Sequence, residues 1–528
     1  MREWGCAEIE TSLRDRVVPA GSGRNALHSK NLRFLFSGLP FPMPSPVAAA
    51  PADVPEAGGV EDEIERVFTR QRSAFRRERP PSRRAREDRL RNLRDRLLAR
   101  RADVKAALYA DFRKPPQEVD ATEISPVKAE IDHVLSHLKA WMKPQPVPTP
   151  SALTGTASAV RYEPKGTALI LAPWNYPVSL TLMPLVSTLA AGNRAILKPS
   201  EFTPHATALM AEMVETLFDE DHVALFSGGP NMAEALTRRP FDHIHFTGSP
   251  AIGKKVMQAA AGHLAPVTLE LGGKSPAVVD ETADVEDAAR KIAWGKFTNA
   301  GQTCIAPDYA LVHEGQQARF VYALRRHLRA FYGATPEERQ ATPDYARLVS
   351  EKHFNHVTGL LAEATERGAR VAEGGQTDAE ECYVAPTILT SVPEDARAMQ
   401  EEIFGPVLPV LPFSTLAGAV DRVNDRPNPL ALYVFSERDA NTEYVLERTT
   451  AGGSCINEVL LHYLNPDLPF GGAGPSGIGR AHGFRGFKEH SNERGVLRRR
   501  FGSSLMSWVY PPYDATARRL IGTMTEWL

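Results

Sequence analysis

Cysteine is scarce in this sequence. The 528 residues contain four cysteines, at positions 6, 304, 382 and 455, and no two of them are close enough to form a paired motif. A disulfide-stabilised secreted domain and a cysteine-based zinc site are therefore disfavoured, and a reducing compartment such as the cytoplasm fits best. We accordingly expect no bound metal ion.

Long apolar runs and an excess of one charge are also missing. The longest apolar stretch, 178–191, is broken by serine, threonine and proline, so no membrane span is expected. The 62 basic and 64 acidic side chains leave a formal net charge of −2, which gives no reason to expect a nucleic acid or an acidic partner. The N-terminus has no basic segment followed by an apolar one, which argues against a secretory signal.

The first 58 residues differ in composition from the rest. Residues 40–59 are rich in proline, alanine and glycine and lack apolar periodicity, which is typical of a disordered segment. Met43 is a plausible second start. The hypothesis is that residues 1–42 are a dispensable extension or an artefact of start-site choice, and an intact mass that includes them would exclude the artefact.

Residues 61–111 combine a helical apolar pattern with a high density of arginine. A polyanion-binding face would explain the arginines, but aspartate and glutamate are interspersed among them. The mixture favours a solvated helix face over a binding surface.

Strand-like and helix-like segments alternate through the middle of the chain. Short apolar strands are predicted at 167–172, 194–198, 223–226, 243–247, 277–279 and 407–410. Helices are predicted at 178–191, 205–217, from about 251, at 285–297 and at 351–370. The β-α-β-α order predicts a parallel sheet with crossover helices, and such sheets bind ligands at the carboxyl ends of their strands.

The segment Asn299-Ala-Gly-Gln-Thr-Cys304 ends on one of the few cysteines. A structural cysteine is usually surrounded by apolar residues, whereas a nucleophilic one needs a polar, partly open setting that lowers its pKa. The short polar stretch therefore predicts that Cys304 is exposed and activated. Cys382 and Cys455 lack such a setting and are predicted to be structural, and Cys6 lies in the N-terminal extension.

Two further segments offer groups that a thiolate reaction needs. Asn175 follows a strand and lies between two prolines, where its amide could donate to a developing oxyanion, although a rigid turn has the same pattern. Glu270 lies between apolar neighbours and before a glycine pair, where a raised pKa would suit it to act as a general base. Taken alone, an acid that caps backbone N–H groups is the better interpretation of Glu270.

Other segments have features of nucleotide contacts. Gly248 and Gly253 lie where a strand runs into a helix, a place where a phosphate can approach the helix N-terminus, although a tight turn has the same pattern. Lys198 and Glu201 follow a strand, where they could bond ribose hydroxyls or form a surface ion pair. The acid and the aromatic ring of Glu402-Ile-Phe404 precede a glycine–proline turn.

Together and in this order, these segments resemble the aldehyde dehydrogenase superfamily, from about residue 61 to residue 497. The resemblance is carried by Pro173-Trp-Asn175, Lys198-Pro-Ser-Glu201, Glu270-Leu-Gly-Gly-Lys274, Gly301-Gln-Thr-Cys304 and Glu402-Ile-Phe-Gly-Pro406. The variants at 171–177, 301–309 and 468–472 look closest to the class 3 branch. Within that branch they are similar to the bacterial coniferyl aldehyde dehydrogenases.

The resemblance implies a division of catalytic roles. Cys304 matches the nucleophile that attacks the aldehyde carbon, and Asn175 with the Cys304 backbone N–H would hold the oxyanion of the thiohemiacetal. Hydride transfer to the cofactor would leave a thioester, and Glu270 matches the base that activates water to hydrolyse it. Transfer of the thioester to coenzyme A is disfavoured, because acylating relatives usually lack that base.

The resemblance also implies NAD as the cofactor, with NADP as an alternative. Lys198 and Glu201 match the pair at the adenine ribose, where the charge of Glu201 favours NAD. Glu402 and Phe404 match the residues at the nicotinamide ribose. The pyrophosphate side is matched by Trp174, Gly248, Ser249 and Gly253. Pro250 departs from the family, which often has threonine there, and puts phosphate contacts at this position in doubt.

The implied fold is α/β and has three parts. These are a Rossmann-like parallel-sheet NAD-binding domain at 59–144 and 162–271, an α/β catalytic domain at 272–466, and protruding oligomerisation strands with a glycine-rich loop at 145–161 and 467–497. Residues 1–58 form the extension and 498–528 the C-terminal tail. The class 3 branch implies a homodimer. The tail places Leu520, Ile521, Met524, Trp527 and Leu528 on one helical face, which we expect to pack on the body or on a partner subunit rather than on a membrane.

The predicted activity is NAD(P)-dependent oxidation of an aldehyde to the carboxylic acid. The small-molecule substrate is expected to be aromatic or hydrophobic and similar to coniferyl aldehyde, with a fatty or medium-chain aldehyde as the alternative. A function of another class, that of a catalytically silent structural or binding protein, is disfavoured by the intact Cys304, Glu270 and Asn175.

Overall fold

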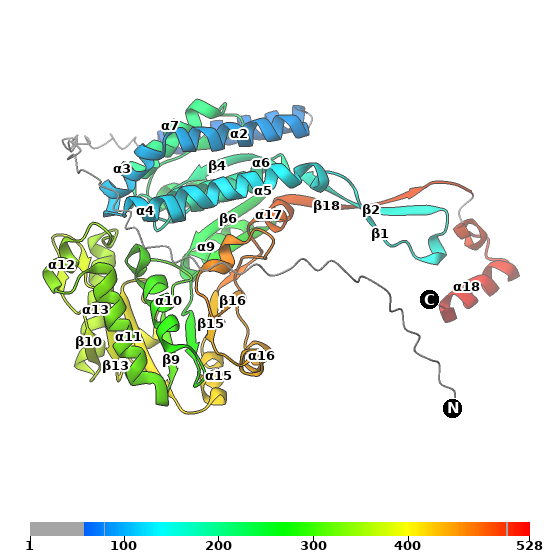
Figure 1. The fold of residues 1–528 in the computed structure, drawn as a ribbon. Helices are drawn as coiled ribbons and strands as arrows, with labels where there is room; N and C mark the ends of the chain where they lie inside the picture. The colour runs from blue at the N-terminus through cyan, green and yellow to red at the C-terminus, as the bar shows by residue number, and fades with distance from the viewer. Residues whose placement is uncertain (1–56, 79, 503–504, 528) are drawn as a thin grey trace, which may run out of the picture. The chain divides into compact units, whose positions relative to one another are not determined.

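The computed structural model describes residues 57–78, 80–502 and 505–527 (Figure 1). The predictions for the N-terminal extension up to residue 56, including Cys6, lie outside this part of the chain. The first described helix, α1 (Ala57–Arg77), begins inside the segment that was expected to be disordered. Helices α2 (Arg83–Ala99) and α3 (Arg101–Phe112) follow, which confirms the helical pattern of residues 61–111.

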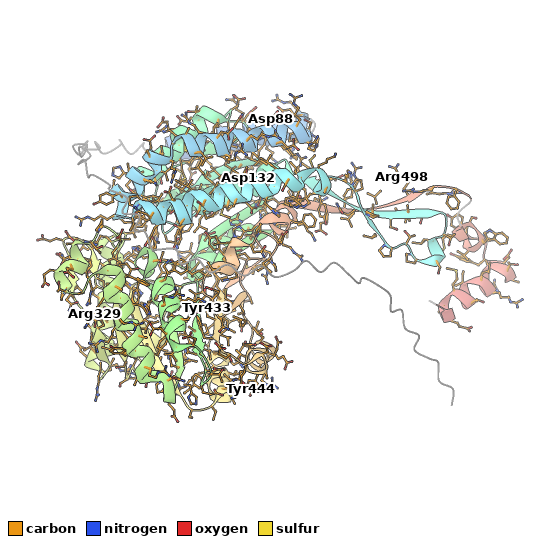
Figure 2. All side chains as sticks on the ribbon, viewed as in Figure 1. Asp88, Asp132, Arg329, Tyr433, Tyr444 and Arg498 are labelled. Carbon is orange, nitrogen blue, oxygen red and sulfur yellow. The ribbon has the colours of Figure 1, made fainter. Side chains whose placement is uncertain are left out.

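The arginines of these helices pair with carboxylates on neighbouring elements. Arg94 of α2 bonds Asp132 of α5 (Ser125–Trp141) at 2.8 Å, and Figure 2 labels this aspartate. Arg66 bonds both carboxylate oxygens of Glu220 at 2.7 Å. The arginine-rich face is therefore paired with acids, as the sequence favoured.

The first large sheet has the strand order β17-β7-β6-β3-β4-β5. Its strands are β3 (Thr167–Leu171), β4 (Arg194–Lys198), β5 (Val223–Leu225), β6 (His243–Gly248), β7 (Val267–Leu271) and β17 (Gly477–Ile478). All except β17 are parallel, which confirms the predicted sheet. The chain order reverses at β3, because β4 and β5 lie on one side of it and β6 and β7 on the other. A ligand site is expected at the carboxyl ends of β3 and β6, where this reversal occurs.

Helices connect the strands of this sheet. They are α6 (Pro177–Ala191), α7 (Pro204–Leu217), α8 (Pro230–Thr237) and α9 (Pro250–Ala261). Each begins with a proline, which has a suitable φ and lacks the N–H that a first helical turn leaves unbonded. Helix α6 ends at Gly192, whose φ of 92° is left-handed and is easily adopted only by glycine. These signals fix where each strand ends and where its helix begins, and they place residues 172–176 directly after β3.

The second large sheet has the order β10-β13-β14-β9-β8-β15-β16. Its strands are β8 (Pro276–Val279), β9 (Tyr309–His313), β10 (Arg370–Glu373), β13 (Thr387–Thr390), β14 (Val407–Phe413), β15 (Ala431–Phe435) and β16 (Gly453–Ile456). Only β10 is antiparallel to its neighbour in the sheet. The accompanying helices are α10 (Val285–Phe297), α11 (Glu314–Tyr332), α12 (Pro336–Ala341), α13 (Glu351–Glu366), α14 (Arg397–Gln400), α15 (Leu416–Asn424) and α16 (Asp439–Arg448).

A third sheet joins β1 (Gln145–Val147), β2 (Thr156–Pro164) and β18 (Ser491–Arg499) in antiparallel pairs. Figure 1 shows it extending away from the two larger sheets. It corresponds to the protruding strands, with two differences from the expected bounds. Strand β2 continues to Pro164, and β17, inside the segment 467–497, pairs with β7 of the first sheet instead.

The remaining elements are short or peripheral. They are α4 (Pro116–Val119), a π-helical turn at Asp120–Ile124, the strand pair β11 (Thr377–Asp378) and β12 (Tyr383–Val384), α17 (Gly483–Glu489) and α18 (Ala515–Trp527). On α18, Leu520 and Ile521 are 36% and 39% exposed, so this face is not buried on the body of the chain. None of the described helices is long and apolar enough to cross a membrane.

Candidate active site

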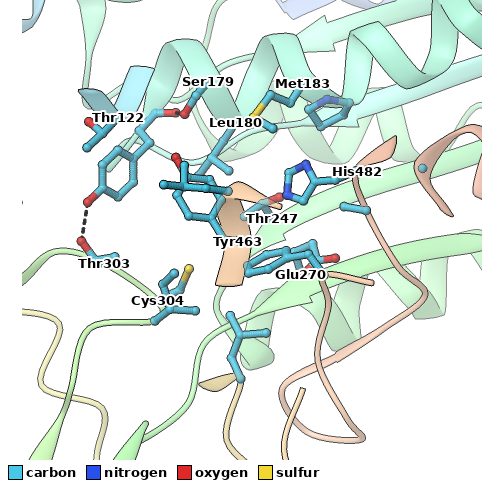
Figure 3. A pocket seen from close by; sticks show the side chains of 18 of the residues that line it. Thr122, Ser179, Leu180, Met183, Thr247, Glu270, Thr303, Cys304, Tyr463 and His482 are labelled. Carbon is cyan, nitrogen blue, oxygen red and sulfur yellow. Dashed lines mark hydrogen bonds between the residues drawn. The ribbon is translucent and has the colours of Figure 1, made fainter. Parts of the chain in front are cut away.

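A cavity of about 250 Å³ lies beside the carboxyl end of β7 and the loop before β9 (Figure 3). Cys304 and Glu270 both line it, so the structure brings these two predicted residues to one space. Most of the other lining side chains are apolar. They include Leu180, Met183, Pro184, Trp294, Ile305, Leu430, Leu460, Leu461, Tyr463, Leu464 and Phe470.

The loop that carries Cys304 is folded by three successive left-handed residues. Asn299, Ala300 and Gly301 have φ values of 56°, 52° and 75°. At Gly301 a side chain would also collide with the backbone carbonyl of Gly405, so the glycine is needed for the close approach of these two loops. The left-handed turn thus brings the Cys304 loop against the segment that contains Glu402 and Phe404.

Gln302 fixes the same loop through its buried amide group. Its Nε2 donates to the carbonyls of Asn299 at 2.9 Å and Arg347 at 3.1 Å, and its Oε1 accepts from the Val349 N–H at 3.0 Å. On the other side of Cys304, the Tyr433 hydroxyl donates to the Ile305 carbonyl at 2.5 Å; Figure 2 labels this tyrosine. Cys304 is therefore held in a loop that is anchored on both sides.

Cys304 is partly exposed, but its pKa is raised, which corrects the expectation of an activated thiolate. Burial raises it to about 12, and the negative charges of Glu402 and Glu270 add to the effect, although the N–H groups of Cys304 and Ile305 oppose it. The polar residues before Cys304 are buried and bond one another and the backbone, so they do not provide a solvated setting.

Glu270 is a buried carboxyl group without hydrogen-bond partners. It lies on β7 next to Thr247 of β6, is 6% exposed, and neither of its oxygens has a partner among the described residues. Burial raises the pKa of Glu270 well above its usual range, the charge of Glu489 raises it further, and Arg480 opposes the shift. The direction agrees with the sequence prediction, and the carboxyl group does not cap the backbone.

Asn175 is close to this site but does not line the cavity. Its Nδ2 donates to the Gln302 carbonyl at 3.0 Å, and its own carbonyl accepts from Asn299 Nδ2 at 3.0 Å. An amide nitrogen carries two hydrogens, so one donor position remains beyond this bond. The oxyanion role of Asn175 stays a prediction.

Tyr176, which the sequence analysis did not single out, lines the cavity beside Asn175. Its hydroxyl bonds Thr303 at 2.5 Å, the dashed contact in Figure 3. The Lys114 ammonium lies 3.9 Å from the centre of the Tyr176 ring and bonds Glu123 at 2.8 Å, with both charged groups fully buried. The other Glu123 oxygen accepts from the Ser179 N–H at 2.9 Å. No sequence pattern connects Lys114 with Tyr176, because tertiary packing alone brings them together.

The predicted cofactor residues gather where the order of the first sheet reverses. The Trp174 ring, after β3, meets the Phe404 ring edge-to-face at 5.3 Å and His353 at 4.4 Å. Lys198, at the end of β4, bonds Glu201 at 3.0 Å. His353, on α13, was not identified from the sequence, which offers no signal for a lone histidine on a helix.

Glu402 lies beside the end of β7. Its carboxylate occupies the space next to Gly272, where a side chain would collide with it, and it accepts from the Gly273 N–H. Burial, and then the charge of Asp308, raise the pKa of Glu402 to about 8. The two acids predicted for catalysis and for cofactor binding thus flank the same strand end.

Gly248 ends β6 and Gly253 lies in the first turns of α9, and packing constrains both positions. A side chain at Gly248 would collide with the Phe246 ring, and one at Gly253 would come within 2.7 Å of Leu271. Both positions therefore leave little room for a side chain, and their place on the pyrophosphate side of the cofactor stays a prediction. Ser249 precedes helix α9 without a side-chain capping bond, and Pro250 occupies the first helical position.

The other described cysteines have no comparable setting. Cys455 is buried and its sulfur lies 3.1 Å from His462 Nδ1, and Cys382 has a left-handed φ of 48°. Both are free thiols with raised pKa values, mainly because of burial. Neither lines the cavity that contains Cys304.

Comparison with known proteins gives one consistent result. The model of the aldehyde dehydrogenase family matches residues 44–496. Aldehyde dehydrogenase family 3 member B1 of Rattus norvegicus is 43% identical over 422 residues, which cover 80% of this chain and 88% of that protein.

Solved structures agree with the sequence comparison. A substrate-bound structure of AldH from Staphylococcus aureus has a TM-score of 0.83 at 41% identity and covers 87% of this chain and 99% of its own. The NAD⁺ complex of an aldehyde dehydrogenase from Bacillus cereus has a TM-score of 0.75 at 29% identity, with 83% and 89% covered.

Proposed function

The chain belongs to the aldehyde dehydrogenase family, in the class 3-like branch, and we propose that it oxidises an aromatic or other hydrophobic aldehyde to the carboxylic acid. The observation that carries this proposal is the shared cavity of Cys304 and Glu270, whose other walls are mainly apolar. A thiol and an unpartnered carboxyl group in one apolar space suit covalent capture of a hydrophobic carbonyl compound followed by hydrolysis.

In the proposed reaction Cys304 forms the covalent bond to substrate. The Cys304 thiol gives its proton to water as its sulfur attacks the aldehyde carbon, and the second Nδ2 hydrogen of Asn175 with the Cys304 N–H stabilises the resulting oxyanion. Loss of hydride converts the thiohemiacetal into a thioester. Glu270 then takes a proton from water, the hydroxyl adds to the acyl carbon, and the C–S bond breaks to release the acid.

NAD is the cofactor we propose, and when bound it supplies the hydride acceptor. The residues at the reversal of the first sheet fit it chemically: the Lys198–Glu201 pair offers a donor and an acceptor for ribose hydroxyls, and the uncapped Ser249 offers a hydroxyl at the start of α9. Glu402 and Phe404 would hold the nicotinamide ribose, with Trp174 against Phe404. The charge of Glu201 favours NAD over NADP.

The apolar cavity supports a hydrophobic substrate but fits both aromatic and aliphatic chains. Leu461, Leu464 and Trp294 line it and are each more than 40% exposed, so its mouth is apolar too. A coniferyl-like aldehyde and a medium-chain alkanal are therefore the two substrates to compare. Steady-state kcat/KM values over benzaldehydes, cinnamaldehydes and alkanals distinguish them.

The decisive assay is NADH formation by the native chain and by Cys304→Ala. We expect NADH with hydrophobic aldehydes from the native chain and none from the variant. Absence of NADH from the native chain with aromatic, aliphatic and semialdehyde substrates would leave a silent family member as the better account. Acyl transfer to coenzyme A is disfavoured by Glu270, and free acid as the product without coenzyme A distinguishes the two.

We also propose that the chain forms a homodimer through its third sheet. Strand β18 is an edge strand in this sheet, and most of its residues are exposed. An exposed edge has unpaired N–H and C=O groups that a second copy can bond. Light scattering of the native chain and of a Val496→Pro variant, which removes a donor from this strand, tests the proposal; an unchanged dimer would exclude this edge.

A further inference from the structure

The cavity has a mouth and an inner end. The exposed side chains Leu461, Leu464 and Trp294 mark the mouth, whereas the lining residues His245, Thr247, His482 and His490 are buried. Figure 3 shows Glu270 and His482 on the side of the cavity opposite Thr122 and Thr303. The inner end is unlike the apolar walls, because it is lined by His245, His482, Arg480, Glu489 and His490.

Three histidines cluster at this inner end. Ring nitrogens of His243, His245 and His490 all lie within 4.8 Å of one another, and all three residues are buried. His245 is two residues before Thr247 on β6, and Thr247 pairs with Glu270, so both side chains project from the same face of the sheet into the cavity. The Nδ1 atom of His245 is buried and has no hydrogen-bond partner among the described residues.

The cluster connects to partly exposed groups on its far side. His243 bonds Thr268 through Nε2 at 3.1 Å, and the Lys165 ammonium lies 3.3 Å from His243 Nδ1. Lys165 also donates to the Glu489 carbonyl, and both Lys165 and Glu489 are partly exposed. Polar groups therefore run from the cavity to the surface without an apolar gap at the histidines.

The proposed reaction requires such a route. Each hydrolysis of the thioester leaves one proton on Glu270, which has no partner to receive it. While a hydrophobic acyl group extends from Cys304 towards the apolar mouth, that side is closed to water. The inner end is the remaining way out for the proton.

We propose that His245, whose Nδ1 has no partner among the described residues, takes up the proton that thioester hydrolysis leaves on Glu270 and passes it to water at the inner end, near the partly exposed Glu489. The proposal rests on the proposed function, because it concerns the proton that thioester hydrolysis produces. His245 acts through Glu270 and does not touch the substrate. In the relay an imidazole accepts a proton on one nitrogen and releases one from the other, so the number of protons on the ring is unchanged after each passage.

The electrostatic setting fits a relay by neutral rings. Burial, and then the neighbouring His482, lower the pKa of His245 to about 3, and burial lowers those of His243 and His490 well below the usual value. The charged groups that face the cluster are Glu270, Glu489, Arg480 and Lys165. Three neutral imidazoles also have the donor chemistry of a zinc site, but the Lys165 ammonium already occupies the Nδ1 lone pair of His243.

The test uses His245→Ala, which opens space for free imidazole, and His245→Phe, which fills the space without a nitrogen. His222→Ala is the matched control, because His222 is also buried, has an unpartnered Nε2 and a pKa lowered to about 3, and lies outside the cavity. Rapid mixing with NAD and a hydrophobic aldehyde separates the first turnover, which reports thioester formation, from the steady state, which reports hydrolysis.

We expect both His245 variants to keep the first turnover and to lose about tenfold or more in the steady state, with a larger solvent isotope effect. Imidazole buffer should restore His245→Ala but not His245→Phe, and His222→Ala should match the native chain. Steady-state rates equal to native in both His245 variants would overturn the relay, as would loss of the first turnover or stoichiometric zinc in the native chain. If the native chain forms no NADH, the proposed function itself fails, and that outcome is distinct from all of these.

Discussion

The loop that carries Cys304 and the strand that carries Glu270 face one cavity but differ in hydrogen bonding. The cysteine loop is tied down by Gln302, which makes three bonds to the backbone, and by the Tyr433 bond beyond it. The carboxyl group of Glu270 has no bond at all among the described residues. One side of the site is built to hold an atom in place, and the other is left free to take up and release a proton.

Both sides nevertheless share a raised pKa. Burial is the first cause for Cys304 and for Glu270, and the charges of Glu402 and Glu270 also raise the pKa of Cys304. The difference therefore lies in geometry and not in the sign of the shift. Variants of the cysteine loop should therefore change the position of the thiol, whereas variants of Glu270 should change proton transfer.

The largest effect is expected from removing the nucleophile. Cys304→Ser should lower kcat/KM by about 10,000-fold or more, because the neutral hydroxyl is a much weaker nucleophile in this buried site. Cys455→Ser is the control, since Cys455 is also a free thiol with a raised pKa but lies outside the cavity. Steady-state NADH formation measures both variants, and a Cys304→Ser enzyme with native activity would remove the thiol from the mechanism.

The second largest effect is expected from replacing Glu270, and it should appear in the steady-state rate and not in the first turnover. Glu270→Gln should keep the first turnover of NADH and lower the steady-state rate by about 100-fold to 10,000-fold, because the amide cannot take a proton from water. For the native chain the steady-state rate should rise with pH as Glu270 ionises, since its raised pKa keeps it protonated at lower pH. Equal steady-state rates in the two proteins would refute Glu270 as the base.

The cysteine loop should instead respond in stability and in the first turnover. Gln302→Leu leaves two buried backbone groups, the Arg347 carbonyl and the Val349 N–H, without partners and should cost about 3 kcal/mol in the free energy of unfolding. The first turnover should slow as well, because Cys304 loses its fixed position. Denaturant unfolding and rapid mixing measure the two effects, and native values for both would show that the bonds of Gln302 do not position the thiol.

Replacing Glu270 should raise stability, whereas replacing Gln302 should lower it. Its folded pKa is raised, so the folded chain holds this proton more tightly than the unfolded chain, and the contribution of Glu270 to stability falls as pH rises above the unfolded value of about 4.5. Glu270→Gln removes this loss and should raise the melting temperature at pH 8 but not at pH 4.5. A lower melting temperature than native at pH 8 would indicate that Glu270 has a stabilising partner.

The smallest effect is expected from Tyr176, whose hydroxyl bonds Thr303 in the cysteine loop. Tyr176→Phe removes the hydroxyl that bonds Thr303, next to Cys304, and should cost about 1 kcal/mol, or about fivefold in kcat/KM. Thr303→Val should give a similar loss because it breaks the same bond. If the double variant loses the product of the two single effects, the two groups act independently and the bond has no role in catalysis.

The fold was predictable from the sequence because its signals are local. Fully buried strands such as β3 and β4 contain short apolar runs at 168–171 and 195–197, and prolines and glycines mark the ends of their helices. The segments containing Cys304 and Glu270 were identified because each motif is a few residues long. The parallel sheet then explains how segments far apart in the chain meet at one edge.

The environment of those residues could not be predicted in the same way. The raised pKa of Cys304 depends on Glu402 and Glu270, and the anchoring of Gln302 depends on Arg347 and Val349. These contacts join distant segments, so no local pattern contains them. The packing of Gly248 against Phe246 and of Gly253 against Leu271 is likewise absent from the local pattern.

The central claim is that Cys304 carries an acyl group which Glu270 helps to release, and one measurement tests it directly. Glu270→Gln is mixed with NAD and a hydrophobic aldehyde, quenched in acid, digested and analysed by mass spectrometry. We predict that the peptide containing Cys304 gains the mass of the acyl group, and that the adduct is absent without NAD. An unmodified Cys304 peptide, or an adduct on Cys382 or Cys455, would contradict the account.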